Sequence, residues 1–179
     1  MEFTFVSGDL ALDFAGTLRH RFHDRHDQLA APADAARWTV AAGLLTREPD
    51  CDHDGLAAAV ALREAVYRAA TAARAGHALG PADTAALNAA AAHAPTVPAL
   101  RPGTGVRRTG TLHAALSDIA RAAVTLLGGP RAADIRECQA PTCTRLYLDA
   151  SRRRTRRWCD MARCGNRAKA AAYRTRHTP

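Results

Sequence analysis

Apolar residues recur at helical spacing through most of the first 130 positions of the chain. Leu10, Phe14 and Leu18 stand four residues apart and predict one buried helical stripe, which follows a short strand with Phe3 and Phe5 in alternation. The same periodicity, with prolines at helix starts and glycines at helix ends, predicts four longer helices. The first begins at Pro32, the second covers 54–75, the third begins at Pro81 and the fourth covers 112–127.

Residues 95–110 interrupt the helical pattern. Val97–Leu100 and 106–108 have the β propensity of short strands and flank an Arg-Pro-Gly-Thr-Gly turn, so a hairpin is predicted. Gly128, Gly129 and Pro130 then end the last of these helices. We take this tripeptide as a hinge between an N-terminal domain over 1–130 and a C-terminal domain over 131–179. The expected N-terminal domain is α+β, mostly helical with a few short strands.

The composition excludes several classes of protein. With 47% hydrophobic and 23% charged residues, the chain of 179 residues is neither disordered nor collagen-like. No apolar run of about 18 residues predicts a helix that crosses a membrane. The segment before the first apolar stretch carries Glu2 and no basic residue, unlike a secretory signal. We therefore expect a cytoplasmic protein without a membrane partner.

Positive charge is concentrated at the C-terminal end of the chain. The first 130 residues hold 12 arginines against 13 acidic residues, whereas residues 131–179 hold 13 basic residues against four acidic ones. The net charge of +8 thus belongs to a near-neutral body with a strongly basic tail. Such a tail is the electrostatic footprint of a polyanionic partner, and the alternative is an arm that only aids solubility.

Four of the five cysteines lie in this basic tail. Cys138 and Cys143 form one C-x4-C pair, and Cys159 and Cys164 form a second pair after 15 intervening residues. Each pair can supply two ligands from one tight turn, so the spacing predicts one structural zinc ion (Zn2+) held by four thiolates, without an open position for a catalytic water. Two disulfides are the competing interpretation, which a reducing cytoplasm disfavours.

The fifth cysteine, Cys51, stands among acidic residues and a histidine in the sequence REPDCDHDG. These side chains are potential metal ligands, but aspartate is also a favoured N-cap and a long helix is predicted to follow. We expect Asp52 or Asp54 to cap that helix.

The tail has the element order of a treble-clef-like zinc finger. A cysteine knuckle leads into a short strand around Leu146 and Leu148, and a helix from about 161 to 176 carries Cys164 in its first turn. On a helical wheel, small residues such as Ala168 and Ala171 share the Cys164 face, while basic residues lie on its flank and on the opposite face. We therefore expect the small face to turn toward the metal and the basic face to turn outward.

An arginine-rich segment before this helix adds a second basic surface. The guanidinium fork suits phosphate oxygens and guanine edges in the major groove, which favours a helix docked on duplex DNA. Asn166 and Arg167 are the candidates for base contact, with capping or bracing of the loop as the alternative for Asn166. The full set of expected nucleic-acid contacts is Arg152, Arg153, Arg154, Arg156, Arg157, Arg163, Asn166, Arg167, Lys169, Tyr173, Arg174 and Arg176.

The segment 156–174, RRWCDMARCGNRAKAAAYR, resembles the CGNR zinc finger, which is named for the tetrapeptide at 164–167. IRECQAPTC and the pattern Tyr147-Leu148-Asp149-x-Ser151 match that finger too, and the body is similar to the ABATE domain through GDLALDFAGTL and PADAARW. The resemblance implies an α+β N-terminal fold, a treble-clef-like finger and a DNA-binding transcription regulator. Gly16 stands where that family typically has asparagine.

Other functions use parts of the same pattern. RNA binding would use the same charges, with few aromatic residues in the tail for stacking, and a protein-interaction adaptor would use zinc as a scaffold. A treble-clef nuclease needs a histidine beside its metal, and none of the eight histidines lies between Cys138 and Arg176, so no enzyme is expected. For the body we expect sensing of a small-molecule effector, formation of a homodimer, or recruitment of another protein.

Overall fold

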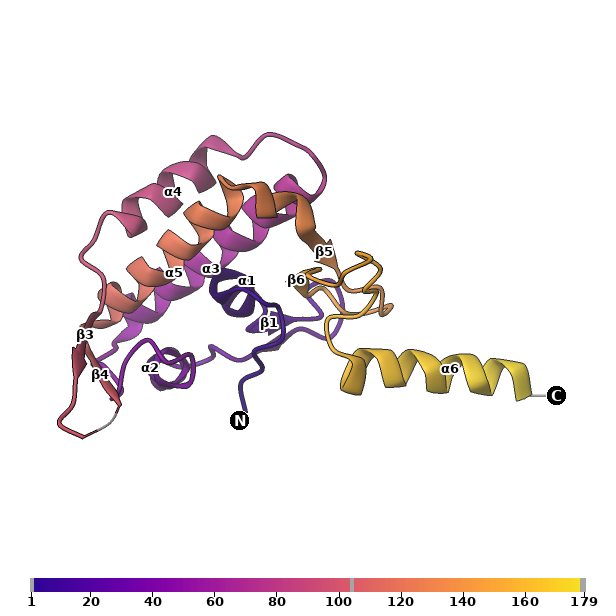
Figure 1. Ribbon diagram of the computed structural model, residues 1–179, viewed down its shortest axis with the longest axis horizontal. Coiled ribbons are helices and arrows are strands. Elements are labelled where there is room, and N and C mark those ends of the chain that lie inside the picture. The colour runs from indigo at the N-terminus through magenta and orange to yellow at the C-terminus, as the bar shows by residue number, and fades with distance from the viewer. Residues whose placement is uncertain (1, 104, 178–179) are drawn as a thin grey trace.

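The computed structural model of the chain describes residues 2–103 and 105–177. A group of helices forms the body, a hairpin projects from one end, and the cysteine-rich segment with its final helix lies at the other end (Figure 1). The helices are α1 (Leu10–Ala15), α2 (Pro32–Ala41), α3 (His53–Arg74), α4 (Pro81–Ala91), α5 (Leu112–Leu127) and α6 (Asn166–His177). Two shorter helical turns are η1 (Pro130–Asp134) and η2 (Met161–Gly165).

The strands are short and form three separate antiparallel pairs among the described residues. They are β1 (Leu18–Arg19) with β2 (His26–Asp27), β3 (Val97–Leu100) with β4 (Val106–Thr109), and β5 (Ile135–Glu137) with β6 (Leu146–Leu148). The chain is therefore mostly helical with a few short strands, as the sequence predicts. None of the helices in the described part of the chain is long and apolar enough to cross a membrane.

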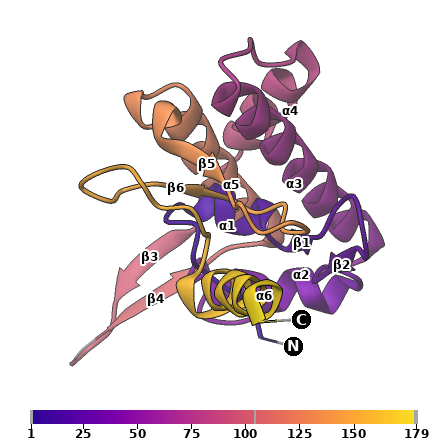
Figure 2. The same cartoon turned by 90° about the vertical axis from the view of Figure 1, so that its right-hand side faces the viewer.

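The core of the body lies where α3, α4 and α5 pack beside one another and α1 packs against α3 and α5 (Figures 1 and 2). Alanine fills much of this contact: Ala59, Ala65 and Ala69 of α3 are fully buried. Because alanine adds only a methyl group, the helices approach closely and leave few voids. The rings of Phe14 and Trp38, 4.8 Å apart, fill the wider space near α2.

Three helices begin at a side-chain cap. Asp52 accepts a hydrogen bond from the backbone N–H of Gly55 (2.8 Å) and caps α3. Of the two predicted caps, Asp52 and Asp54, it is therefore Asp52 that serves. Asp9 caps α1 and Thr111 caps α5 in the same way. Helices α2 and α4 begin instead at the predicted prolines, whose missing N–H groups would have no helical partner at that position.

The N-terminal segment differs from the prediction. Phe3 and Phe5 lie in irregular backbone and not in a strand. The backbone N–H groups of Val6 and Ser7 donate to the carboxylate of Asp13 (2.9 and 2.8 Å), so a side chain takes the place of a neighbouring strand. The prediction missed this because the alternation of two aromatic residues does not reveal the hydrogen-bond partner.

The first helix is also shorter than predicted. It ends at Ala15, because Gly16 forms its C-cap and the N–H of Thr17 turns back to the carbonyl of Phe14 (3.1 Å). Leu18 lies in β1 and is nevertheless buried. The apolar spacing thus identified a core position correctly but extended the helix past its end.

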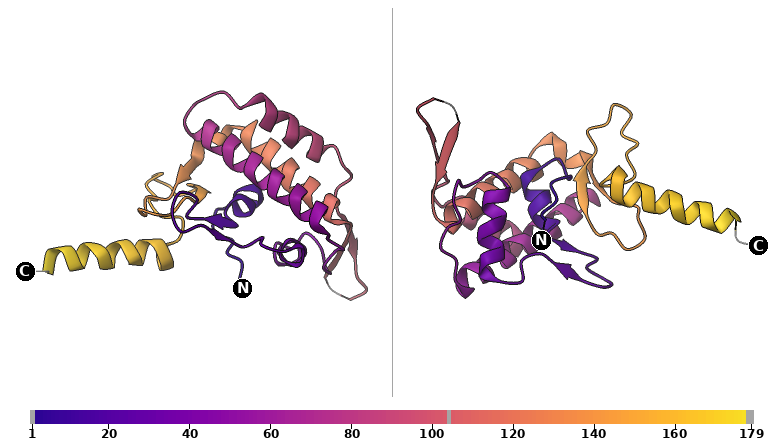
Figure 3. Two further views of the ribbon diagram at one scale, coloured as in Figure 1. Left: turned by 180° about the vertical axis from the view of Figure 1, so that it is seen from behind. Right: turned by 90° about the horizontal axis from the view of Figure 1, so that it is seen from below.

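The predicted hairpin over 95–110 is present, with Val97 opposite Thr109 and Leu100 opposite Val106. Every residue of β3 and β4 is exposed, and the pair extends away from the helices (Figures 2 and 3).

The cysteine-rich segment shares a core with the body. Strands β5 and β6 pack against α1, α3 and α5, and one buried cluster joins Leu12, Ala70, Leu126, Ile135, Leu146 and Leu148. Among the described residues, the main contact of helix α6 is with η2, and the helix projects away from the body (Figures 1 and 3).

Candidate metal centre and basic surface

The sulfur atoms of Cys138, Cys143, Cys159 and Cys164 lie within 4.8 Å of one another. The Sγ of Cys159 is 3.8 Å from that of Cys143 and 3.7 Å from that of Cys164. Four zinc–sulfur bonds of about 2.3 Å in a tetrahedron require sulfur–sulfur distances of about 3.8 Å. No described cysteine is in a disulfide. The cluster therefore fits one structural zinc ion.

The elements of the finger bring the two cysteine pairs together. The first pair lies in the turn between β5 and β6, and Cys164 lies in η2, directly before α6. Asp160 starts this turn by accepting a hydrogen bond from the N–H of Ala162 (2.8 Å). The arrangement is that of a treble-clef-like finger: a knuckle on a hairpin, and a helix whose first turn holds the last ligand.

The four neighbouring thiols shift one another's pKa values in opposite directions. Hydrogen bonds from Cys143 and Cys159 lower the pKa of Cys138 to about 2, and the pairing with Cys138 raises the pKa of Cys143 to about 12. The hydrogen bond with Cys138 also raises the pKa of Cys159, and burial raises the pKa of Cys164. A divalent cation at the centre favours all four thiolates, because its charge compensates their mutual repulsion.

Arg156 and Tyr147 brace the finger around the metal centre. The guanidinium of Arg156 donates to the carbonyl oxygens of Trp158 (2.9 Å), Cys159 and Val6 (3.0 Å). It also lies over the ring of Tyr147, 4.5 Å from the ring centre, and the Tyr147 hydroxyl donates to the carbonyl of Arg156. Arg156 is therefore half-buried, and its contacts join the second cysteine pair to the N-terminal segment.

Two further arginines, Arg145 of the finger and Arg19 of the body, join the two parts of the chain. Arg145 is buried, and its guanidinium donates to the carbonyl oxygens of Thr4 (3.1 Å) and Gly16 (3.2 Å). Arg19 lines a small pocket of about 50 Å³ together with Cys143 and other residues of the finger. Its Nε atom is buried without a hydrogen-bond partner in the described structure, and the negative charge of the cysteine sulfurs attracts its guanidinium. Burial and the charge of Arg145 lower the pKa of Arg19.

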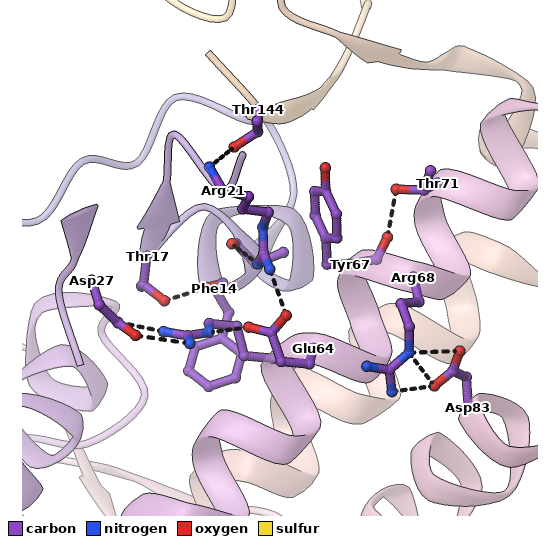
Figure 4. Close-up of polar contacts among 12 residues, drawn as sticks. Phe14, Thr17, Arg21, Asp27, Glu64, Tyr67, Arg68, Thr71, Asp83 and Thr144 are labelled. Carbon is purple, nitrogen blue, oxygen red and sulfur yellow. Dashed lines mark hydrogen bonds and ion pairs between the residues drawn. The ribbon is translucent and has the colours of Figure 1, made fainter. Parts of the chain in front are cut away.

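A network of ion pairs positions the β1–β2 pair, whose first strand carries Arg19. Arg63, only 1% exposed, donates to both carboxylate oxygens of Asp27 and to Glu64 (Figure 4). Glu64 also accepts from Arg21, whose guanidinium lies 3.7 Å from the centre of the Tyr67 ring. The backbone N–H of Arg21 donates to the hydroxyl of Thr144 (3.3 Å), the residue after Cys143, so this network reaches the metal centre.

The four acidic residues of the finger are all engaged, either with arginines or with hydrogen-bond donors of the finger itself. Glu137 pairs with Arg74 of α3 (3.0 Å), and Asp134 pairs with Arg154 (2.8 Å). Asp149 accepts hydrogen bonds from Ser151 and from the N–H of Arg156. Asp160 caps η2. In the described part of the chain, two basic residues of the finger also form ion pairs: Arg154 pairs with Asp134, and Arg145 pairs with Asp13 of the body.

Most of the residues predicted to contact nucleic acid are exposed. The arginine-rich segment exposes Arg152, Arg153, Arg154 and Arg157, and the helical part exposes Arg163, Asn166, Arg167, Lys169, Tyr173 and Arg174. Arg157 bonds to Gln139 (2.7 Å), and the amide nitrogen of Asn166 donates to the carbonyl of Ala162 (3.2 Å), which braces the turn. The side chain of Arg176 lies outside the described residues.

The predicted contact between the small face of α6 and the metal is wrong beyond its first turn. Ala168 is half-buried, but Ala171 and Thr175 are exposed because the helix projects away from the rest of the finger (Figure 1). A helical wheel sorts residues by face and assumes that a neighbour lies alongside the whole helix. Here the rest of the finger lies beside only about the first turn of α6.

A model of the ABATE family, described as "Putative stress-induced transcription regulator", matches residues 8–130. The chain belongs to the ABATE family. A model of the CGNR zinc finger matches residues 135–177. The comparison with curated proteins gave no match.

The structure shows what surrounds Gly16, the position at which the resemblance seen in the sequence predicts asparagine. A Cβ atom on Gly16 would lie 2.9 Å from Nη1 of Arg145, so the guanidinium occupies the space that a larger side chain needs. Neither Arg19 nor Arg145 was recognised in the sequence as part of the site. Both lie more than a hundred residues from one of their partners, and no local motif marks them.

Proposed function

We propose that this ABATE protein is a DNA-binding transcription regulator whose zinc finger holds a basic surface on duplex DNA. The observation that carries the proposal is the distribution of charge on the finger. Its four acidic residues are all engaged, with arginines or with hydrogen-bond donors of the finger, while basic side chains such as Arg152, Arg167 and Lys169 are exposed. A polyanion therefore meets a surface on which basic residues outnumber acidic ones, 13 against four over residues 131–179.

The two exposed segments of the finger have different roles in this proposal. Arg152 and Arg153, in the turn before the second cysteine pair, contact phosphates and position the protein without reading sequence. Helix α6 is a projecting 12-residue helix of a width that the major groove admits. Arg167, exposed at its start, is our candidate for base contact, because the Asn166 amide is engaged in the turn.

Zinc has a structural role in this proposal. When bound, it crosslinks the two cysteine pairs and compensates the charge of four thiolates, and it keeps no position for a catalytic water. The fold then sets the direction of α6 through η2. The protein acts in the cytoplasm, where reducing conditions keep the four thiols available to the metal. The body senses an effector, forms a homodimer or recruits another protein.

Selection of bound fragments from a random duplex pool tests the base-contact assignment. The zinc-loaded parent is expected to enrich a common sequence, and Arg167→Ala is expected to lose that enrichment while Arg68→Ala, on the exposed side of α3, retains it. Equal enrichment by Arg167→Ala and the parent would show that Arg167 contacts only the backbone.

The salt dependence of binding tests the function itself. The logarithm of the affinity for duplex DNA is expected to fall linearly with the logarithm of salt concentration, with a slope of about −0.9 for each phosphate neutralised. Stronger binding to single-stranded RNA would favour the RNA alternative. Weak binding without salt dependence, or equal affinity for heparin and DNA beside tight binding to an acidic protein, would favour the adaptor.

A further inference from the structure

The hairpin β3–β4 and the adjoining Arg101 form a second projecting feature, which we name the basic arm. Its strands are exposed on both faces: Val97 is 60% and Leu100 is 89% exposed. The body's buried core is complete without it, since no residue of either strand belongs to a buried cluster among the described residues. A hairpin that contributes nothing to the core is free to contact a partner.

The arm is basic, whereas the body as a whole is near neutral. Residues 95–110 contain Arg101, Arg107, Arg108 and no acidic residue, although residues 1–130 as a whole hold 13 acidic residues against 12 arginines. With Arg47 of the neighbouring loop, these arginines line a pocket of about 300 Å³ in which Glu48 is the one acidic lining residue. None of the four arginines takes part in the ion pairs of the described structure.

The base of the arm is held in place on the body. The N–H of Arg108 donates to the Thr46 hydroxyl (2.8 Å), and the N–H of Thr46 donates to the Arg108 carbonyl (3.0 Å). The hydroxyl of Thr96, directly before β3, donates to the carboxylate of Asp118 on α5 (2.6 Å). Hydrogen bonds therefore fix the base of the arm to the body.

The arm and α6 lie at opposite ends of the molecule, and both reach the lower side of the body in Figure 1. The turned view of Figure 2 agrees, with β3, β4 and α6 all on the lower side of the helical body. A partner that lies along this side meets two basic projections. The major groove of DNA admits a two-stranded ribbon as well as a helix.

We propose that the basic arm is a second contact for the duplex that the zinc finger holds, with Arg101, Arg107 and Arg108 on its phosphate backbone. This inference rests on the proposed function. A second copy of the chain is a poorer occupant, because two arms paired with each other would bring six arginines together. The exposed valines and Leu100 then pack on the sugars of the groove wall.

A comparison of salt slopes tests the inference on the full, zinc-loaded chain. The arm variant carries Arg101→Gln, Arg107→Gln and Arg108→Gln, and a charge-matched control carries Arg68→Gln, Arg121→Gln and Arg131→Gln on α3, α5 and η1. A finger variant carries Arg152→Gln, Arg153→Gln and Arg167→Gln. Affinity for a duplex of about 30 base pairs is measured over a range of salt concentrations.

The arm variant is expected to bind with a slope that is shallower by about 2 to 3, because each arginine no longer neutralises a phosphate, while the control keeps the parent's slope. If the finger variant loses affinity and the arm variant matches the parent, the arm is not a contact and the proposed function stands. If the parent shows no salt-dependent binding, both proposals fail. If the parent sediments as a dimer that Val97→Ser with Leu100→Ser dissociates, the arm is a protein interface and the inference is overturned.

Discussion

Nη1 of Arg145 lies 3.7 Å from Oδ1 of Asp13, so a residue two positions after a metal ligand meets a carboxylate of the first helix. Both side chains are buried. Burial raises the pKa of Asp13, although hydrogen bonds from Ser7 and Val6 and the charge of Arg145 oppose this rise. The Asp13–Arg145 pair lies at the junction of the finger and the body. We therefore expect the stability of the finger and that of the body to be linked.

Replacing Arg145 is expected to destabilise both parts of the chain together. Arg145→Met leaves Asp13 without its cation and two carbonyl oxygens without a donor, which costs about 3 kcal/mol of unfolding free energy. Urea denaturation followed through Trp38 in the body and Trp158 in the finger measures this. Both tryptophans should report the same lowered midpoint, whereas Arg153→Met, an exposed control, should leave it unchanged. Separate midpoints in the Arg145 variant would contradict the coupling.

The position of Gly16 gives a second stability prediction. Gly16→Asn introduces a Cβ atom 2.9 Å from Arg145 Nη1, so the variant is expected to lose about 1 to 2 kcal/mol through overpacking. In the Arg145→Met background the penalty should be smaller, because the more flexible methionine side chain gives way. A double-mutant cycle on unfolding free energies measures the difference. Strictly additive effects would show that the two positions do not compete for space.

Metal content tests the cysteine cluster. The parent should contain one zinc ion per chain by elemental analysis, and Cys159→Ser should lose stoichiometric zinc because three thiolates remain. Cys51→Ser is the matched control, since Cys51 lies outside the cluster, and it should retain the metal. Retention of zinc by Cys159→Ser would place the metal elsewhere.

Arg19 is expected to stabilise the loaded centre through its charge. Arg19→Gln removes a guanidinium that the cysteine sulfurs attract, and release of zinc to a chelator should be roughly tenfold faster. Arg19→Lys, which keeps the charge, should restore part of the difference, and the exposed Arg25→Gln should match the parent. Should Arg19→Gln and the parent release zinc at equal rates, the contact has no electrostatic role.

The ion pair between Asp27 and Arg63 predicts a pH dependence of stability. Burial opposes ionisation of Asp27, but hydrogen bonds and charge from Arg63 outweigh it and hold the pKa below the ordinary value of 3.8. A depressed carboxyl pKa adds stability that is present above that ordinary value and is lost as the pH falls through the folded value. Asp27→Asn should therefore cost about 2 kcal/mol at pH 7, and the difference should narrow below pH 4. A difference that stays constant from pH 7 to pH 3 would contradict this.

Patterns within one segment predicted most of the elements. The starts of α2 and α4 followed from prolines, the cap of α3 from an aspartate, and the hairpin at 95–110 from two β-prone stretches around a glycine-rich turn. The metal ligands followed from two equal cysteine spacings. Each of these signals is local, because the residues that decide the structure are close together in the chain.

Contacts between distant segments escaped prediction. The strand expected at Phe3 and Phe5 does not form, because the N–H groups of Val6 and Ser7 bond to Asp13. Its charge predicts that Arg156 contacts nucleic acid. In the structure, its guanidinium donates to three carbonyl oxygens around the metal centre. Charge patterning counts arginines and does not distinguish one that donates to backbone from one that faces solvent.

By itself, the order of residues determined that this chain has a helical body, a four-cysteine finger and an excess of positive charge at its C-terminal end. Helical periodicity, metal-ligand spacing and net charge are properties of short segments, so they can be seen without a fold. Only the tertiary structure decided that Arg19 and Arg145 join the body to the finger, that α6 projects into solvent, and that the arm and the finger share one side. Those facts depend on which surfaces, distant in the sequence, pack together. The burial of apolar surface over the whole chain determines that packing.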